Sequence, residues 1–180
     1  MELFVKKGMD CQVVDYGCRN PLPGVYYRGP DLNGVEGEYD VAVCNHVLEH
    51  VADPIGELLS VRKALVANGV LFVEVPFELW NKKHPKPSEP VTHINWFSMP
   101  SLRFCLKAAG FDVLSMHYSS FRTYVGTKGL AVRAIARKSD VLEREEGHAC
   151  GDRSEVCLLK DIQRGRIGAL MESFVALPAG

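Results

Sequence analysis

Long apolar runs, paired cysteines and an excess of one charge are all missing from this sequence of 180 residues. No uninterrupted apolar stretch approaches the ~20 residues that a membrane-spanning helix needs, so we expect no contact with a membrane. Residues 1–7 lack the ordered basic, apolar and small-residue regions of a secretory signal. The 21 basic and 22 acidic residues nearly balance, which argues against nucleic acid as a partner.

The cysteines include no C-x-x-C pair, the spacing that zinc and redox motifs often use. They are spread along the chain at Cys11, Cys18, Cys44, Cys105, Cys150 and Cys157. Three of them lie in apolar segments with the pattern of a helix or strand. We therefore predict reduced thiols in a cytoplasmic protein rather than a disulfide framework.

Short apolar segments bounded by turn residues predict several strands. Early ones are expected at 11–16, 25–28, 39–44 and 70–76, and later ones at 111–118 and 130–137. The segments 39–44 and 70–76 are apolar almost throughout, which is typical of parallel strands covered on both faces. We predict that these two are neighbouring, parallel and central in the sheet.

One helix is predicted between those two strands. Asp53 supplies an N-cap acid and Pro54 suits the first helical position. Apolar residues then recur at helical spacing as far as Leu65, with Arg62 the one exception among them. We expect the helix to end at Asn68–Gly69.

A second helix should begin at the cap Ser98 and run to Ala109, closed by Gly110. It follows a long polar loop at 77–97, and such a loop in a compact domain often serves a function. Alternation of strands and helices predicts a doubly wound α/β domain. In such domains ligands bind beyond the carboxyl ends of the strands, so the residues after each strand are the candidates for a site.

The composition changes after the α/β pattern ends. Residues 139–154 are charged, whereas 155–176 return to helical apolar spacing, at Leu159, Ile162, Leu170 and Phe174. We therefore expect an α/β domain at 1–138 and, at 139–180, a charged linker with a C-terminal helix. That helix is expected to dock on the same domain or on a second copy, which would make a homodimer.

Three segments in the middle of the chain carry recognisable motifs. Residues 39–54 combine an aromatic-Asp strand with a His-Val-Leu-Glu-His-Val run and an Asp-Pro; residues 65–76 and 93–111 continue the pattern in order. Together they resemble class I S-adenosylmethionine-dependent methyltransferases over residues 39–118. The resemblance implies a Rossmann-like, mostly parallel sheet flanked by helices, with S-adenosylmethionine as cofactor.

The N-terminal third resembles that family less completely. Asp15 and Gly17 match the first-strand motif beside the cofactor, and Asp31 fits the acid that would hold the ribose hydroxyls. Arg19 stands where a second glycine is expected. The short stretch from Gly17 to Asp31 leaves little room for the family's first helix, so the cofactor half is predicted to be abbreviated and to bind weakly or not at all.

A second alignment of this region is open. In it Asp15 is the ribose acid, Asp31 is the adenine-side acid, and the first motif is absent. Both alignments leave the cofactor half incomplete. Asn45, directly after the 39–44 strand, is the remaining residue that the resemblance assigns to the cofactor.

Methyl transfer from a sulfonium needs alignment of three atoms and sometimes the removal of a proton. His46, just past a strand, and His93, in the long loop, are therefore the candidate bases. The resemblance implies a small-molecule or sugar-like acceptor. The alternative is a degenerate, non-catalytic domain that keeps the fold for binding or assembly.

His46 to His50 also satisfies H-x-x-E-H, the inverted zinc-protease pattern. On a helix the two histidines would face one metal ion. However, His46 follows a strand directly, and for a third ligand the sequence offers only the guesses Glu74 and His93. A zinc hydrolase is the least favoured hypothesis, and we predict no stoichiometric zinc at His46 and His50.

Overall fold

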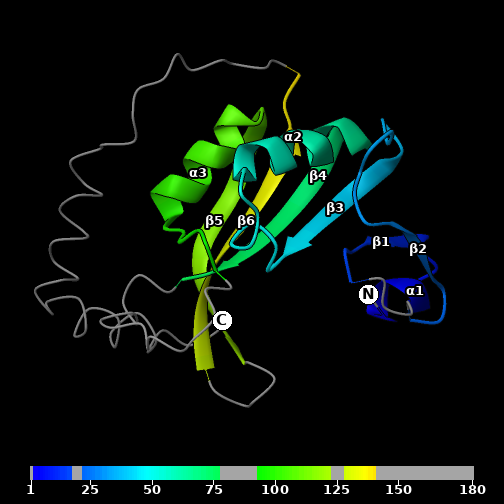
Figure 1. The fold of residues 1–180 in the computed structure, drawn as a ribbon, viewed down its shortest axis with the longest axis horizontal. Coiled ribbons are helices and arrows are strands. Elements are labelled where there is room, and N and C mark those ends of the chain that lie inside the picture. Colours follow the sequence, from blue (N-terminus) through cyan, green and yellow to red (C-terminus); the bar gives the residue numbers. More distant parts are fainter. Residues whose placement is uncertain (1, 18–21, 78–92, 123–127, 141–180) are drawn as a thin grey trace, which may run out of the picture.

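The computed structural model describes residues 2–17, 22–77, 93–122 and 128–140, and these form three helices and six strands (Figure 1). In chain order the elements are α1 (Glu2–Lys6), β1 (Cys11–Val14), β2 (Val25–Gly29), β3 (Tyr39–Asn45), α2 (Pro54–Ala64), β4 (Leu65–Pro76), α3 (Met99–Ala108), β5 (Phe111–Arg122) and β6 (Lys128–Lys138). The later strands and both longer helices lie where the sequence predicts them.

The strands form two separate sheets. β1 pairs with β2 in parallel, and the larger sheet has the order β3-β4-β6-β5. Within the larger sheet β3 and β4 are parallel, whereas β6 is antiparallel to both β4 and β5. The prediction that β3 and β4 are parallel neighbours is confirmed. The prediction that both are central is wrong, because β3 is an edge strand of this sheet.

Helix α2 begins as its cap predicts and ends earlier than expected. The Asp53 side chain accepts a hydrogen bond from the Gly56 backbone N–H at 2.9 Å. The helix stops at Ala64, and Leu65 is already extended, with φ −77° and ψ 141°. Leu65 is fully buried and pairs with the start of β3, so its contribution to the apolar pattern comes from the sheet and not from the helix.

Helix α3 follows the predicted boundaries closely. The Ser98 hydroxyl accepts from the Ser101 backbone N–H, and the Ser101 side chain accepts in return from the Ser98 backbone N–H. This reciprocal cap gives a hydrogen-bond partner to two backbone N–H groups at the beginning of the helix, which would otherwise have none within it. Gly110, with φ 76°, follows the last turn and lets the chain reverse into β5.

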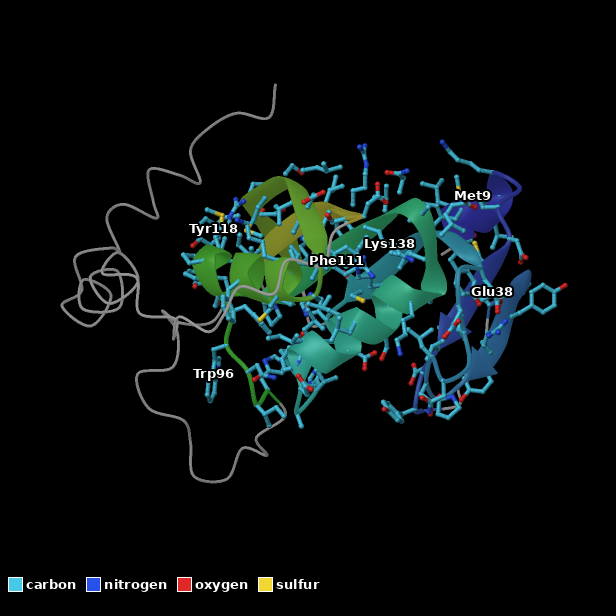
Figure 2. All side chains as sticks on the ribbon, turned by 90° about the horizontal axis from the view of Figure 1, so that it is seen from above. Met9, Glu38, Trp96, Phe111, Tyr118 and Lys138 are labelled. Atoms are coloured by element: carbon cyan, nitrogen blue, oxygen red, sulfur yellow. The ribbon has the colours of Figure 1, made fainter. Side chains whose placement is uncertain are left out.

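The apolar core lies between the larger sheet and its two helices. Figures 1 and 2 show α2 and α3 side by side on the same face of that sheet. Side chains that are fully buried there include Leu58 on α2, Leu102 and Leu106 on α3, and Leu71 and Val73 on β4. This packing holds the carboxyl ends of β3 and β4 in a fixed position.

The face of the larger sheet opposite the two helices is exposed, and we call it the open face. Val41 and Val43 on β3 are 58% and 48% exposed, and Ile135 on β6 is 39% exposed. Val43 pairs with Phe72, and Phe72 pairs with Ile135, so these side chains form one apolar row. The expectation that β3 is covered on both faces is therefore wrong, because both described helices beside this sheet pack on the other face.

The N-terminal unit, α1 with β1 and β2, lies beside the β3 edge (Figure 1). The Tyr39 hydroxyl donates to Gln12 Oε1 at 2.7 Å, and Arg28 pairs with Glu38 at 3.0 Å. The described residues between β1 and β2 contain no helix. This agrees with the abbreviated N-terminal half that the sequence predicts.

Some expectations fall on parts of the chain that the structure does not describe. They are the C-terminal helix at 155–176, Arg19, and the thiols of Cys18, Cys150 and Cys157. Cys11, Cys44 and Cys105 form no disulfide bond in the described part of the chain. Among the described helices none has the length and apolar character that crossing a membrane requires.

Candidate functional site

The turn after β3 carries His46 in an unusual backbone conformation. Its φ is 54°, in the left-handed region that a residue other than glycine rarely adopts. The His46 backbone N–H donates to the Glu74 carbonyl at 2.9 Å, which extends the β3–β4 pairing by one residue. This backbone anchor fixes the direction in which the His46 side chain leaves the sheet.

The imidazole of His46 lies between two acidic side chains. Its Nδ1 is 3.2 Å from Glu49 Oε1, and its Nε2 is 3.2 Å from Glu74 Oε1. The Phe121 ring lies at 5.0 Å between centroids. The contact with Glu49 raises the pKa of His46 most, burial acts in the opposite direction, and Glu74 raises it further. Both ring nitrogens are therefore engaged in holding carboxylates.

Glu74 forms an ion pair that crosses the larger sheet. Its Oε2 accepts from Arg133 Nε on the neighbouring strand β6, while its Oε1 faces His46. Asn45, Glu74, Arg133 and His117 occupy paired positions on four successive strands. They form a polar row on the open face at the carboxyl end of β3, next to the apolar row.

Glu49 is fully buried, and neither of its side-chain oxygens has a hydrogen-bond partner among the residues that the structure describes. The contact with His46 Nδ1 has the distance of an ion pair without the direction of a hydrogen bond. The Nε2 of His50 is farther away, 3.8 Å from Glu49 Oε1. The His93 ring meets the His50 ring edge-on, at 4.8 Å between centroids. The structure thus brings His93 to Glu49 and His50, although the long loop separates His93 from that pair in the sequence.

A cleft opens where the N-terminal unit meets α2. It has a volume of about 420 Å³, and its lining includes Tyr16, His50 and Glu57. Burial and the nearby charge of Asp31 raise the pKa of Glu57. Carboxyl oxygens accept hydrogen bonds, so Glu57 and Asp31 together suit a ligand that carries hydroxyl groups.

The residues expected to bind the cofactor surround this region without all meeting in one cavity. Asp15 accepts from the Gly17 backbone N–H at 2.6 Å, and Asp31 accepts from the Asn33 backbone N–H at 2.9 Å, so both acids order the turns after their strands. Asp31 lines a second hollow of about 490 Å³ beside β2. Asn45 is exposed at the end of β3.

Several residues of the site are not identified by the sequence analysis. Arg133 was passed over because its partner Glu74 becomes apparent only when the β4–β6 register is known. Glu57 lies in the first turn of α2 and reads as a favourable charge at a helix N-terminus. Tyr16, 81% exposed, was expected at the end of the strand 11–16, whereas β1 ends at Val14 and leaves Tyr16 in the turn that follows, where ligands of such sheets bind.

Residues 2–116 match a family model described as a methyltransferase domain. Among solved structures, a Methanosarcina mazei S-adenosylmethionine-dependent methyltransferase is 19% identical, with a TM-score of 0.52 over 64% of this chain and 68% of that one. The Burkholderia thailandensis 1,6-didemethyltoxoflavin-N1-methyltransferase, solved with 1,6-didemethyltoxoflavin and S-adenosylhomocysteine, is also 19% identical, with a TM-score of 0.57 over 77% and 65%. No curated protein sequence matches significantly. These likenesses confirm the Rossmann-like α/β fold.

Proposed function

The chain belongs to the class I S-adenosylmethionine-dependent methyltransferase family, and we propose that it transfers a methyl group from that cofactor to a small-molecule acceptor. The size of the cleft, about 420 Å³, supports an acceptor of small-molecule dimensions. The near balance of 21 basic and 22 acidic residues supports a partner other than nucleic acid.

One observation carries this proposal: polar groups from several elements converge at the carboxyl end of β3. Asn45 and His46 end that strand, His50 follows them, and Tyr16 after β1 and Glu57 on α2 approach from the other side. Ligands of open α/β sheets bind at this end of the strands. This position supports our assignment of these side chains to the region where a cofactor and an acceptor would meet.

We assign the cofactor to the side of the cleft formed by the N-terminal unit. Asp31 and Glu57 would accept hydrogen bonds from the ribose hydroxyls, and Gly17 would let the backbone approach the ligand without an intruding Cβ. Asp15 supports the Gly17 turn through its 2.6 Å hydrogen bond. Asn45 lies on the path between this side and His46. When bound, the cofactor supplies the sulfonium methyl group.

The acceptor is assigned to the side of the cleft lined by His50, whose ring meets the ring of His93 edge-on. His46 is held at both ring nitrogens by Glu49 and Glu74, so we propose that it positions these carboxylates and is not itself the base. His93 is partly exposed and is our candidate for removing a proton from the acceptor.

A non-catalytic domain of the same family is the second candidate. It is favoured by the lack of a helix in the described residues between β1 and β2. The Rossmann-like unit normally presents its phosphate- or cofactor-binding turn at the start of such a helix. Losing two or three polar contacts at about 0.5–1.5 kcal/mol each weakens binding by orders of magnitude.

Calorimetric titration with S-adenosylmethionine and S-adenosylhomocysteine distinguishes the two candidates. We expect binding weaker than micromolar that falls a further roughly two- to tenfold in Asp31→Asn, which keeps the Oδ1 that orders its turn but removes the charge. Asp112→Asn, which removes an exposed charge on β5, is the matched control. No heat with either ligand would support the non-catalytic domain. Micromolar binding would show that the cofactor half is complete enough to function.

A further inference from the structure

We infer that Glu49, His50 and His93 form a binding site for one divalent transition-metal ion of the zinc class. Each residue offers one ligand atom, and these atoms all lie within 4.8 Å of one another. Two imidazoles and one carboxylate are the ligands of many catalytic zinc sites and of non-haem iron sites. This site does not require the proposed methyl transfer, and a domain without that activity could hold it equally well. A bound metal would occupy His93, so the base proposed above would act only in the metal-free chain.

The state of Glu49 is the strongest argument for a bound cation. The side chain is fully buried, and among the described residues neither of its oxygens has a hydrogen-bond partner. Burial of a carboxylate without such partners is strongly unfavourable. His46 approaches one oxygen, but it also holds Glu74. A metal ion on the opposite side would supply the partner that the described residues do not.

The backbone brings the third ligand to the other two. The Glu49 carbonyl accepts from the N–H groups of Ile94 and Asn95, at 2.8 and 3.1 Å. The Asn95 side-chain amide in turn donates to the carbonyls of Leu48 and Val51, at 3.1 and 2.6 Å. These bonds fix the segment that follows His93 against the segment that carries Glu49 and His50.

The ligand atoms need only a small adjustment to bind a metal. In a tetrahedral zinc site, bonds of about 2.0–2.2 Å place neighbouring ligand atoms roughly 3.3–3.6 Å apart. The present limit of 4.8 Å is longer by little more than one ångström. His50 is exposed and His93 is partly exposed. His50 also lines the cleft, which leaves a coordination position open toward solvent or the acceptor.

The geometry revises our expectation from the sequence. We expected no zinc because His46 and His50 do not lie on one helix and because a third ligand was undefined. The structure leaves His46 out of the ligand set, since its two nitrogens already face Glu49 and Glu74. It places His93 beside His50 instead. The three ligands come from a turn and a loop and do not follow the spacing of H-x-x-E-H.

The test is metal titration of the full-length chain without a histidine tag, after treatment with a chelator. We compare wild type with His50→Ala, His93→Ala and Glu49→Gln, and His117→Ala is the control for loss of an exposed histidine elsewhere. We expect one Zn²⁺ per wild-type chain by calorimetry and a tetrahedral visible spectrum with Co²⁺. Removal of either ligand histidine should weaken binding at least about 10-fold, the lower end of what loss of a supporting residue costs.

A measurement of unfolding temperature guards against misfolded variants. Zn²⁺ should raise the unfolding temperature of wild type and His117→Ala because it binds only the folded chain, and it should not raise that of His50→Ala. Stoichiometric binding that survives in both His50→Ala and His93→Ala would overturn the proposal. So would the absence of stoichiometric binding to wild type, whatever the titrations with S-adenosylmethionine show.

Discussion

Arg62 interrupts the apolar pattern of α2, and the structure explains why. Its Nε donates to the Gly110 carbonyl at 3.2 Å, and its Nη2 donates to the Ser139 carbonyl at 2.6 Å. One side chain thus joins α2 to the turn after α3 and to the end of β6. Replacement by methionine keeps the length and the helix propensity of the side chain but removes both hydrogen bonds.

The expected loss can be worked out from these contacts. Hydrogen bonds to a charged group contribute about 1.5–3 kcal/mol each, so two give an upper limit of about 3–6 kcal/mol. Arg62 is only partly buried, and the Gly110 carbonyl keeps a second hydrogen bond, from the Ser139 N–H at 3.0 Å. We therefore expect Arg62→Met to lower the free energy of unfolding by about 1.5–3 kcal/mol, near half of that limit.

The assay is urea unfolding followed by circular dichroism, with Lys63→Met as the control. Lys63 is exposed, adjacent, and equally placed in the last turn of α2, so this variant removes the same charge at the helix C-terminus. Lys63→Met should change the free energy of unfolding by no more than about 0.5 kcal/mol. If the two variants are equally stable, the reasoning about Arg62 is refuted.

Three further outcomes are expected. Leu102→Ala leaves a cavity under α3 and should cost about 2–5 kcal/mol in urea unfolding, whereas Leu3→Ala, at an exposed position, should cost no more than about 0.5 kcal/mol. Burial, with a smaller effect of Glu57, raises the pKa of the Cys44 thiol to about 12. Iodoacetamide at pH 8 should therefore label Cys44 far more slowly than the partly exposed Cys105, as measured by peptide mass spectrometry. Equal labelling rates would contradict this prediction. Deletion of residues 150–180 should lower the free energy of unfolding or change the mass in solution, because we expect the predicted C-terminal helix to dock. Docking would be excluded if the deleted chain has the same mass by light scattering and the same free energy of unfolding in urea as the full chain.

The sequence predicts well those elements whose signals are local. Asp53 and Ser98 mark the beginnings of α2 and α3 because a cap acts on backbone groups within one turn. The strands β5 and β6 are likewise predicted, from short apolar segments between turns. The end of α2 and the start of β4 were misplaced, because Leu65 satisfies the helical spacing by coincidence while it packs as part of the sheet. β5 also runs beyond the expected end at 118, as far as Arg122.

Properties that depend on distant segments could not be predicted in this way. The apolar strand 39–45 gives no indication that no described element covers one of its faces, because coverage depends on elements elsewhere in the chain. The approach of His93 to His50 depends on where the loop returns, and the hydrogen bonds of Asn95 that fix this return have no local signal. The sequence identified the histidines, and the structure determines which of them meet.

The separation of the strands into two sheets has a consequence for how the chain opens. Every pairing in the larger sheet joins strands between residues 39 and 138, and every pairing in the smaller sheet joins strands between 11 and 29. Each sheet can therefore act as its own cooperative unit in hydrogen exchange. The contacts that join them include the Tyr39–Gln12 hydrogen bond and the Arg28–Glu38 ion pair. Amide protons of β1 and β2 should exchange while those of β4 and β6 remain protected. A ligand bound between the units would slow the exchange in β1 and β2, and the free energy needed to order these strands would reduce the affinity of that ligand.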